Sequence, residues 1–317
     1  MASAANADTY TLTKGEQEQI FEEAENWIDD MPEGLQDRLS DAVNHAMHGF
    51  YSEINYFREF SDTASLKHYP VTVQDINSGD ASDIPLRIYA KKGIGTQSKL
   101  PVLIYFHGGG WSVGSLNATE KFCRALASEG NVKVISVDYP LAPEHPYPSG
   151  INKSVEAVDY VYANAAKLGI DPARISLGGD GAGGNIALNV YFKIVSDKSV
   201  KSIVLYYPLL QTGGTLSQDS KREYGRGFGF DSRLWEIFTE VYKGKDMPPV
   251  NLPDLLLISA GRDIIIDQEK DFVAGNPSIK YIEFSGALHG FITDGHQNTA
   301  FNKAVSLTDL FLTQTRK

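Results

Sequence analysis

Residues 177–185 read LGGDGAGGN and join an apolar run that predicts a buried strand (residues 174–177) to one that predicts a helix (residues 186–192). A strand that turns sharply into a helix through glycines is the geometry that presents a nucleophile at the edge of a sheet, and its usual pattern is Gly-x-Ser-x-Gly. In this chain Gly181 takes the place of the serine, and because glycine has no side-chain oxygen, no acyl group can be bound covalently there. The adjacent carboxylate of Asp180 is expected to point elsewhere, since neighbouring side chains of such a turn diverge.

A second glycine-rich stretch could supply the N–H donors that stabilise the oxyanion of an acyl transfer. Residues 107–111 read HGGGW, and without a Cβ the residues Gly109 and Gly110 can turn their N–H groups toward one point. The N–H of Ala182, at the start of the predicted helix, adds a donor that the helix dipole strengthens. The alternatives are a turn without function and a phosphate cradle, but there is no Gly-Lys-Ser/Thr and no G-x-G-x-x-G opening a helix in the first βα turn.

A histidine and two carboxylates follow the last two predicted strands. His289 lies in the sequence GALHGF directly after the last strand, and Asp263 lies in GRDIIID directly after the strand before it. The chain order of glycine turn, acid and histidine is the one expected of a Ser-His-Asp triad on an α/β sheet. Asp267 is the rival for the acid; Asp263 is favoured because it lies nearer the strand end, and Asp267 is interpreted as capping or orienting the following helix.

Strand and helix patterns alternate along most of the chain and predict an α/β fold with a mostly parallel sheet and helices on both faces. The strands are expected at residues 68–75, 86–90, 101–106, 132–138, 174–177, 202–207, 255–260 and 279–284. The helices are expected at residues 13–30, 35–60, 118–129, 151–168, 186–192, 232–242 and 300–315. In such sheets ligands bind beyond the carboxyl ends of the strands, so the loops that carry the candidate residues should open onto one crevice.

Composition limits the partners and the compartment. The 317 residues carry a net charge of −11 and are 42% hydrophobic, which argues against nucleic acid and anionic membranes as partners. Cys123 is the only cysteine, which fits a reducing compartment. The first residues have no positive region and no long apolar run, and no later run is long enough to span a membrane, so the expected location is the cytoplasm.

Together these motifs resemble the hormone-sensitive-lipase branch of the α/β-hydrolase fold, which includes bacterial acetyl esterases and short-chain carboxylesterases. The matching motifs are HGGGW at 107–111, DY at 138–139, LAPEHPYP at 141–148, GD-x-AGGN at 179–185, Asp263 and HGF at 289–291. The resemblance implies an eight-stranded sheet in a catalytic domain at residues 61–317, with a helical cap formed by residues 1–60 and an insertion at about 208–248. It also implies an oxyanion hole made by the N–H groups of Gly109, Gly110 and Ala182.

The chain departs from the family pattern in three places. Gly181 replaces the nucleophilic serine, and Pro140 replaces an arginine that usually follows the tyrosine, which leaves an ion pair of Glu144 in question. The segments 246–253 and 272–278 are shorter than usual, which predicts a trimmed cap hinge and a trimmed helix before the last strand, or residues absent from the chain.

The favoured interpretation is a short-chain carboxylesterase that is inactive because an engineered or recent change removed its serine. With serine restored, His289 would take the hydroxyl proton and Asp263 would hold the imidazole tautomer. The alternative is a ligand-binding protein, naturally without catalysis, on an esterase scaffold. The expected partner is a small ester, no metal or organic cofactor is implied, and the sequence is compatible with a homodimer. Plausible pocket walls, for which plain core packing is an equal alternative, are Trp111, Tyr207, Phe291 and Ile292.

Overall fold

The computed structural model describes residues 10–59, 66, 69–79, 83–94, 98–129, 132–212, 216–245 and 251–314. The strands are β1 (Val71–Asn77), β2 (Pro85–Lys91), β3 (Leu100–Phe106), β4 (Lys133–Val137), β5 (Ile170–Asp180), β6 (Ser202–Tyr206), β7 (Asp254–Arg262) and β8 (Lys280–Leu288). They form one eight-stranded sheet in the order β1-β2-β4-β3-β5-β6-β7-β8. The pairs β1–β2 and β2–β4 are antiparallel and the other pairs are parallel, so the predicted mostly parallel sheet is confirmed.

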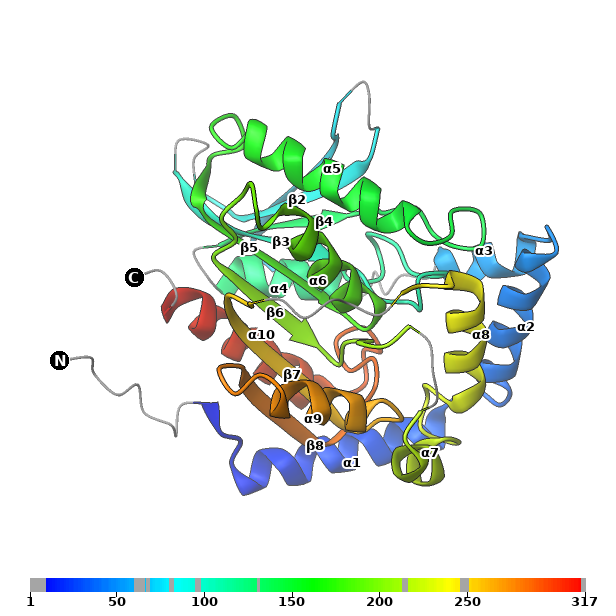
Figure 1. The fold of residues 1–317 in the computed structure, drawn as a ribbon. Coiled ribbons are helices and arrows are strands. Elements are labelled where there is room, and N and C mark those ends of the chain that lie inside the picture. Colours follow the sequence, from blue (N-terminus) through cyan, green and yellow to red (C-terminus); the bar gives the residue numbers. More distant parts are fainter. Residues whose placement is uncertain are drawn as a thin grey trace.

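Helices cover both faces of this sheet (Figure 1). They are α1 (Lys14–Asp30), α2 (Leu35–Met47), α3 (Ser52–Arg58), α4 (Glu120–Glu129), α5 (Ser149–Ala163), α6 (Ala182–Ile194), α7 (Gln218–Tyr224), α8 (Ser232–Tyr242), α9 (Ile266–Ala274) and α10 (Asn298–Gln314). One face carries α1, α4 and α10 over one apolar core, and the other carries α5, α6 and α9 over a second core. Within the described residues, no helix is long and apolar enough to cross a membrane.

The central strand β3 corresponds to the continuous apolar run at residues 101–106, and helices cover it on both faces. Its alternate side chains enter the two different cores, with Ile104 and Phe106 in one and Leu103 and Tyr105 in the other. All four are fully buried. Because successive strand residues point to opposite faces, a strand between two helical layers has to be apolar at every position.

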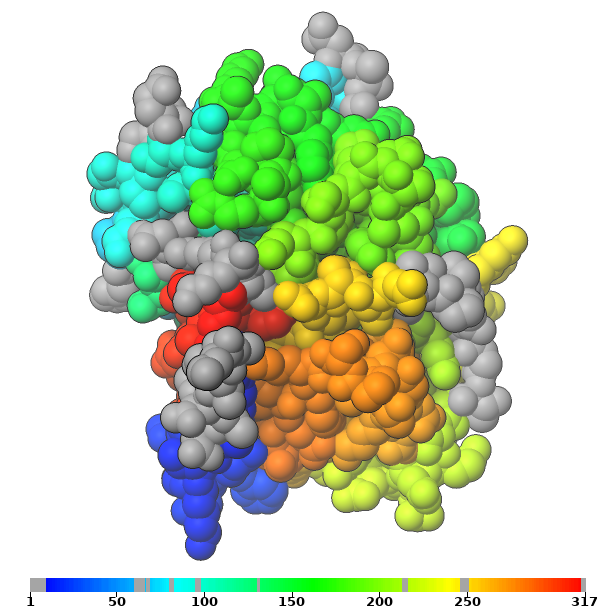
Figure 2. Space-filling model, turned by 60° about the vertical axis from the view of Figure 1, so that its left-hand side comes forward, coloured from blue at the N-terminus to red at the C-terminus, as the bar shows by residue number. Residues whose placement is uncertain are grey.

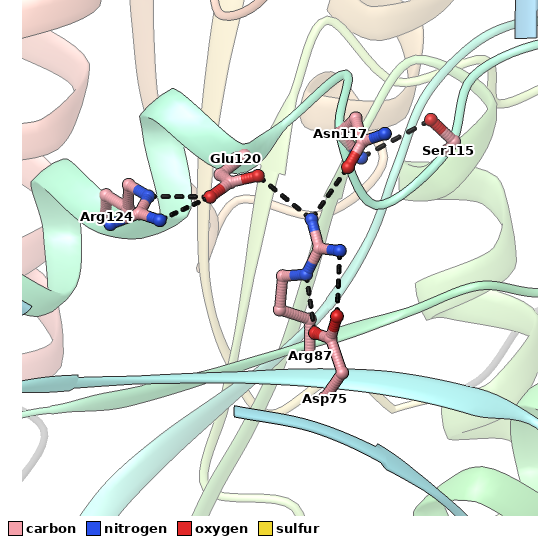
Figure 3. A network of polar contacts seen from close by, with 6 residues as sticks. All are labelled: Asp75, Arg87, Ser115, Asn117, Glu120 and Arg124. Carbon is pink, nitrogen blue, oxygen red and sulfur yellow. Dashed lines mark hydrogen bonds and ion pairs between the residues drawn. The ribbon is translucent and has the colours of Figure 1, made fainter. Parts of the chain in front are cut away.

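The antiparallel edge of the sheet is tied to α4 by a cluster of charged side chains around Arg87 (Figure 3). Arg87 on β2 binds both carboxylate oxygens of Asp75 on β1, at 2.6 and 3.0 Å, and also donates to Asn117 Oδ1 and Glu120 Oε2. Arg124 in turn pairs with Glu120 within α4. The hydrogen bond from Arg87 lowers the pKa of Asp75 below its usual value, so this carboxylate stays charged and the edge strand stays fixed.

The N-terminal helices separate into two groups. Thr13 caps α1, with its Oγ1 accepting from Glu16 N and its own N–H donating to the Glu16 carboxylate. Helix α1 packs against β8 and α10, and Figure 2 shows this blue segment beside the orange and red segments. Helix α2 packs instead against α8, at the right-hand end of the molecule in Figure 1.

Some predicted boundaries are wrong. The helical region expected at residues 35–60 breaks between α2 and α3, where Gly49 has φ +87, and Phe50, in this break, is 69% exposed. The short helix α7 was not predicted, because its seven residues carry no clear apolar period. The trimmed segment 246–253 falls largely outside the described residues, since 246–250 are not among them.

Candidate active site

The carboxyl ends of four strands carry the residues that the sequence singles out. His107 follows β3, Gly181 follows β5, Asp263 follows β7 and His289 follows β8. Because these strands are parallel, their carboxyl ends share one edge of the sheet. A small cavity lined by residues such as Arg174 lies at the other edge, where the strands begin, and contains none of these candidates.

The predicted base and acid are in contact. His289 Nδ1 lies 2.6 Å from Asp263 Oδ2, and the side chain of Asp263 has no exposed surface. The other carboxylate oxygen accepts the N–H of Ile265 at 3.2 Å, which fixes the carboxylate plane. Asp267 faces elsewhere, since its Oδ2 accepts the N–H of Ser220 at the start of α7. Asp263 rather than Asp267 therefore has the geometry to orient the imidazole.

Gly181 lies directly against the other nitrogen of this imidazole. Its backbone has φ +50 and ψ −117, a conformation in which a residue with a Cβ is strained. The turn is fixed by hydrogen bonds from Gly181 N to Tyr206 O and from Leu209 N to Gly181 O, both at 3.0 Å. A Cβ placed on Gly181 would lie 3.3 Å from His289 Nε2, so a side chain at this position would point at the imidazole.

The triple-glycine turn and the start of α6 are packed against each other. A Cβ on Gly183 would lie 2.0 Å from the carbonyl oxygen of Phe106 and 2.5 Å from that of His107, so only glycine permits this approach. Gly109 and Gly110 have φ +112 and +56, and no described residue accepts a hydrogen bond from the N–H of either. The N–H of Ala182, in the first turn of α6, likewise has no acceptor within its helix.

Asp180 is directed away from His289, as its place beside Gly181 predicts. Its Oδ1 accepts the hydroxyl of Tyr105 at 2.8 Å and the N–H of Gly108 at 3.0 Å. Burial raises the pKa of Asp180 above its usual value, although these two donors partly oppose that shift. The carboxyl group therefore holds the triple-glycine turn against β5 and does not replace a nucleophile.

The turn is also held from the other side by aromatic and charged groups. The hydroxyl of Tyr139 donates to His107 O at 2.7 Å, and the two rings stack at 4.4 Å. Arg58 of α3 donates to Ser112 O at 2.9 Å and binds both carboxylate oxygens of Glu144 at 2.7 and 2.9 Å. Although Pro140 stands where the family usually has an arginine, Glu144 still forms an ion pair with an arginine, and this arginine is Arg58 of α3.

Aromatic rings surround the imidazole and the turn. Tyr207 and Phe230 lie on His289 with ring centroids at 4.7 and 4.4 Å. The ring of Phe238 on α8 lies against Gly110, where a Cβ would approach it to 2.2 Å. The proposed wall residue Tyr207 is therefore beside the imidazole.

The other three proposed wall residues have mainly core contacts. Phe291 packs on Tyr207, with ring centroids at 4.9 Å, and the N–H of Ile292 donates to the Tyr207 hydroxyl at 3.3 Å. Trp111 stacks in parallel on Tyr242 of α8 at 4.2 Å. All three are at most 2% exposed, and their part in a pocket stays a prediction.

Three residues that contact the site were missed from the sequence. Arg58, Phe230 and Phe238 belong to α3, to the loop before α8 and to α8, far along the chain from the residues they touch. The signals were present but weak: an arginine at the end of a predicted helix, and aromatic residues in the expected cap insertion. Their contacts could not be inferred because nothing in the local pattern fixes how a cap lies on a sheet.

Comparisons with known proteins agree with this architecture. A family model described as the alpha/beta hydrolase fold matches residues 103–293. Carboxylesterase NlhH of Mycobacterium tuberculosis is 46% identical over 130 residues, which are 40% of this chain and 40% of that protein. Carboxylic ester hydrolase LipN of the same organism is 29% identical over 247 residues, 70% of this chain and 65% of that protein. The chain thus spans less than two thirds of the length of these curated relatives.

Solved structures are similar over most of the chain. A hyperthermophilic esterase from the archaeon Pyrobaculum calidifontis has a TM-score of 0.75 and 26% identity, covering 87% of this chain and 97% of its own. A thermostable esterase from Pseudomonas putida has a TM-score of 0.77 over 92% of this chain and 97% of its own, and at 19% identity it supports the fold alone. These findings confirm the resemblance to the hormone-sensitive-lipase branch that the motifs indicated.

Proposed function

This chain belongs to the alpha/beta hydrolase fold family, and on that premise we propose that it is a carboxylesterase of the acetyl esterase type whose nucleophile is absent. Its substrate class would be esters of short carboxylic acids. The aromatic rings of Phe230 and Phe238 support short acyl groups, because they lie directly against His289 and Gly110 and leave little room at the turn.

The observation that carries the proposal is the position of His289 between Asp263 and Gly181. Its Nδ1 is 2.6 Å from the carboxylate, and its Nε2 is 3.3 Å from where a Cβ would stand on Gly181. A serine there would bring its hydroxyl next to Nε2, the arrangement in which histidine takes the proton as the oxygen attacks. The N–H groups of Gly109, Gly110 and Ala182 would then bind the oxyanion.

The test is Gly181→Ser, assayed with p-nitrophenyl acetate and butyrate. Removing the nucleophile of a serine triad costs about six orders of magnitude in kcat, so we expect the substitution to raise ester hydrolysis by about four to six orders. Adding His289→Gln to the same variant should remove most of that gain. Because Gly181 has φ +50, the serine variant should be less stable by roughly 1–3 kcal/mol, and urea unfolding checks that it is folded.

The second candidate is a ligand-binding protein without catalysis, and Gly181 itself is the observation that favours it. A folded Gly181→Ser variant with no gain in hydrolysis would support this alternative and contradict the esterase. The origin of the glycine, natural or engineered, is a separate question that the unmodified gene sequence would answer.

A further inference from the structure

We propose that this chain, as it stands, hydrolyses activated esters directly, with a water molecule or a small alcohol beside Gly181 acting as the nucleophile and His289 as its base. The inference rests on the proposed function, because it uses the same base and the same oxyanion donors. It differs in the bond that forms: no acyl group is ever attached to the protein.

The space for such a nucleophile is defined by the missing side chain. Among the described residues, and leaving out the chain neighbours of Gly181, two atoms lie within 4 Å of a Cβ on this residue: His289 Nε2 at 3.3 Å and Cε1 at 3.8 Å. The other glycines of the site differ sharply, since a Cβ on Gly109 or Gly110 would approach a neighbouring atom to 2.2 Å. At residue 181 the close neighbour of this position is therefore the imidazole nitrogen and not a backbone atom, so a water or methanol oxygen placed there would lie next to Nε2.

The imidazole is prepared to accept a proton at this place. Nδ1 is bound to Asp263 Oδ2 at 2.6 Å, which assigns the ring proton to Nδ1 and leaves the lone pair on Nε2. No described residue forms a hydrogen bond with Nε2. Tyr207 and Phe230 both pack on the ring, with centroids at 4.7 and 4.4 Å, which restricts its rotation and keeps Nε2 beside Gly181.

The reaction balances without a further reactant. As the oxygen of water bonds to the carbonyl carbon of the ester, Nε2 takes the proton and the carbonyl oxygen becomes the oxyanion bound by the backbone N–H groups. The tetrahedral intermediate then collapses, the bond to the alkoxy oxygen breaks, and Nε2 returns the proton to the leaving alcohol. With methanol as the nucleophile, the same steps give a methyl ester in place of the acid.

The decisive comparison is between the unchanged chain, Gly181→Ala and His289→Gln. Alanine provides no nucleophile, like glycine, but its methyl group would occupy the position 3.3 Å from Nε2 in which the inference places the nucleophile. We expect Gly181→Ala to lower the residual hydrolysis of p-nitrophenyl acetate about tenfold or more, because a misplaced reactant loses most of the benefit of proximity. His289→Gln should lower it about 100-fold, the usual contribution of a general base.

A product assay adds a readout that a merely structural effect would not change. With methanol added to the buffer as probe, gas chromatography should detect protein-dependent methyl acetate with the unchanged chain and none above background with Gly181→Ala. Equal residual rates for the unchanged chain, Gly181→Ala and His289→Gln would overturn the inference, as would methyl acetate in the same proportion for all three.

The two proposals fail in different experiments. If Gly181→Ser gains activity but Gly181→Ala matches the unchanged chain, the direct route is wrong and the esterase assignment stands. If folded Gly181→Ser gains nothing, the esterase assignment is wrong, and the residual rates of Gly181→Ala and His289→Gln still decide the direct route. If Gly181→Ala does not fold, His289→Gln and the methanol product in the unchanged chain give the answer.

Discussion

Arg58 is the residue through which α3 holds the triple-glycine turn, and replacing it tests whether that link matters for the fold. Its guanidinium donates to Ser112 O at 2.9 Å and to Ala142 O at 3.1 Å, and it binds both oxygens of Glu144. Methionine at this position would keep the apolar stem and remove every donor. The variant Arg58→Met therefore isolates the polar contribution.

The contacts set the expected magnitude. Ser112 and Ala142 are at most 1% exposed, so each carbonyl that loses its donor should cost about 1–1.5 kcal/mol. The pair with Glu144 adds at most about 1 kcal/mol, because the glutamate side chain is 29% exposed and water screens the interaction. We expect Arg58→Met to lower the free energy of unfolding by about 3 kcal/mol, measured by urea unfolding at pH 7 with tryptophan fluorescence.

The same pair predicts how the effect changes with pH. The hydrogen bond from Arg58 is the largest cause that holds the pKa of Glu144 below its usual 4.5. A carboxyl group whose pKa is lower in the folded state stabilises the fold above its unfolded pKa, and this stabilisation is lost as the pH falls through the folded value. The difference between wild type and Arg58→Met should therefore shrink when urea unfolding is repeated below about pH 4.5.

A matched control guards against a general effect of removing an arginine. Arg222 pairs with Asp219 on α7, but both side chains are more than three-quarters exposed, at 76% and 79%. Arg222→Met should change the free energy of unfolding by no more than about 0.5 kcal/mol. If Arg58→Met is equally mild, or if its cost does not depend on pH, then the observed contacts of Arg58 do not hold α3 on the turn.

Substitutions at two further residues test buried carboxyl groups. The free energy of unfolding of Asp180→Asn should stay within about 1 kcal/mol of that of the unchanged chain, because asparagine keeps an acceptor. Asp180→Ala should lower it by roughly 2–4 kcal/mol, because the Tyr105 hydroxyl and the Gly108 N–H are left unpaired. Urea unfolding of both variants at pH 7 measures the difference. Burial and then the charge of Asp263 raise the pKa of Glu269 well above its usual 4.5, so above that pH the unfolded chain gives up a proton that the folded chain keeps, and the fold loses stability as the pH rises. Glu269→Gln, which leaves an oxygen for Ser259, should therefore gain stability over wild type by at most about 1.4 kcal/mol per pH unit, and equal slopes of unfolding free energy against pH would refute it.

The sheet could be predicted because its signals are local. The run at residues 101–106 is apolar at every position, and β3 is buried on both faces. Strand ends were less certain: β5 extends back to Ile170, beyond the expected start at residue 174, because Leu100 pairs with Ile170 across the sheet. A pairing partner 70 residues away leaves no trace in the local pattern, and the same holds for strand boundaries in general.

Contacts in the site likewise divide into those that strand ends predict and those that depend on how distant elements pack. Asp263 and His289 could be predicted because each directly follows a strand, and the parallel sheet brings strand ends together. Arg58 could not, because its partner Glu144 lies 86 residues away and α3 reaches it only through the packing of the N-terminal helices. The contact of Phe230 with His289 could not be predicted either, because it depends on how the chain before α8 lies over the turn.

The packing gives the base, the acid and the glycines of the site a structural role that does not depend on catalysis. Gly108 would bring a Cβ within 2.4 Å of Asp180, and Gly109 would bring one within 2.2 Å of the Val113 carbonyl, so both are needed for the fold whether or not an oxyanion is ever bound. Asp263 has no exposed surface, and removing its partner His289 would leave a buried carboxylate without its main donor, at a cost of several kcal/mol. Selection for stability alone would keep these residues. Gly181 is different, because among the described residues beyond its chain neighbours a Cβ would meet no atom closer than His289 Nε2 at 3.3 Å, a tight contact that a small shift of the imidazole relieves, and the main obstacle to serine is the backbone conformation. The presence of the His289–Asp263 pair and of these glycines therefore carries no information on whether a serine ever stood at residue 181.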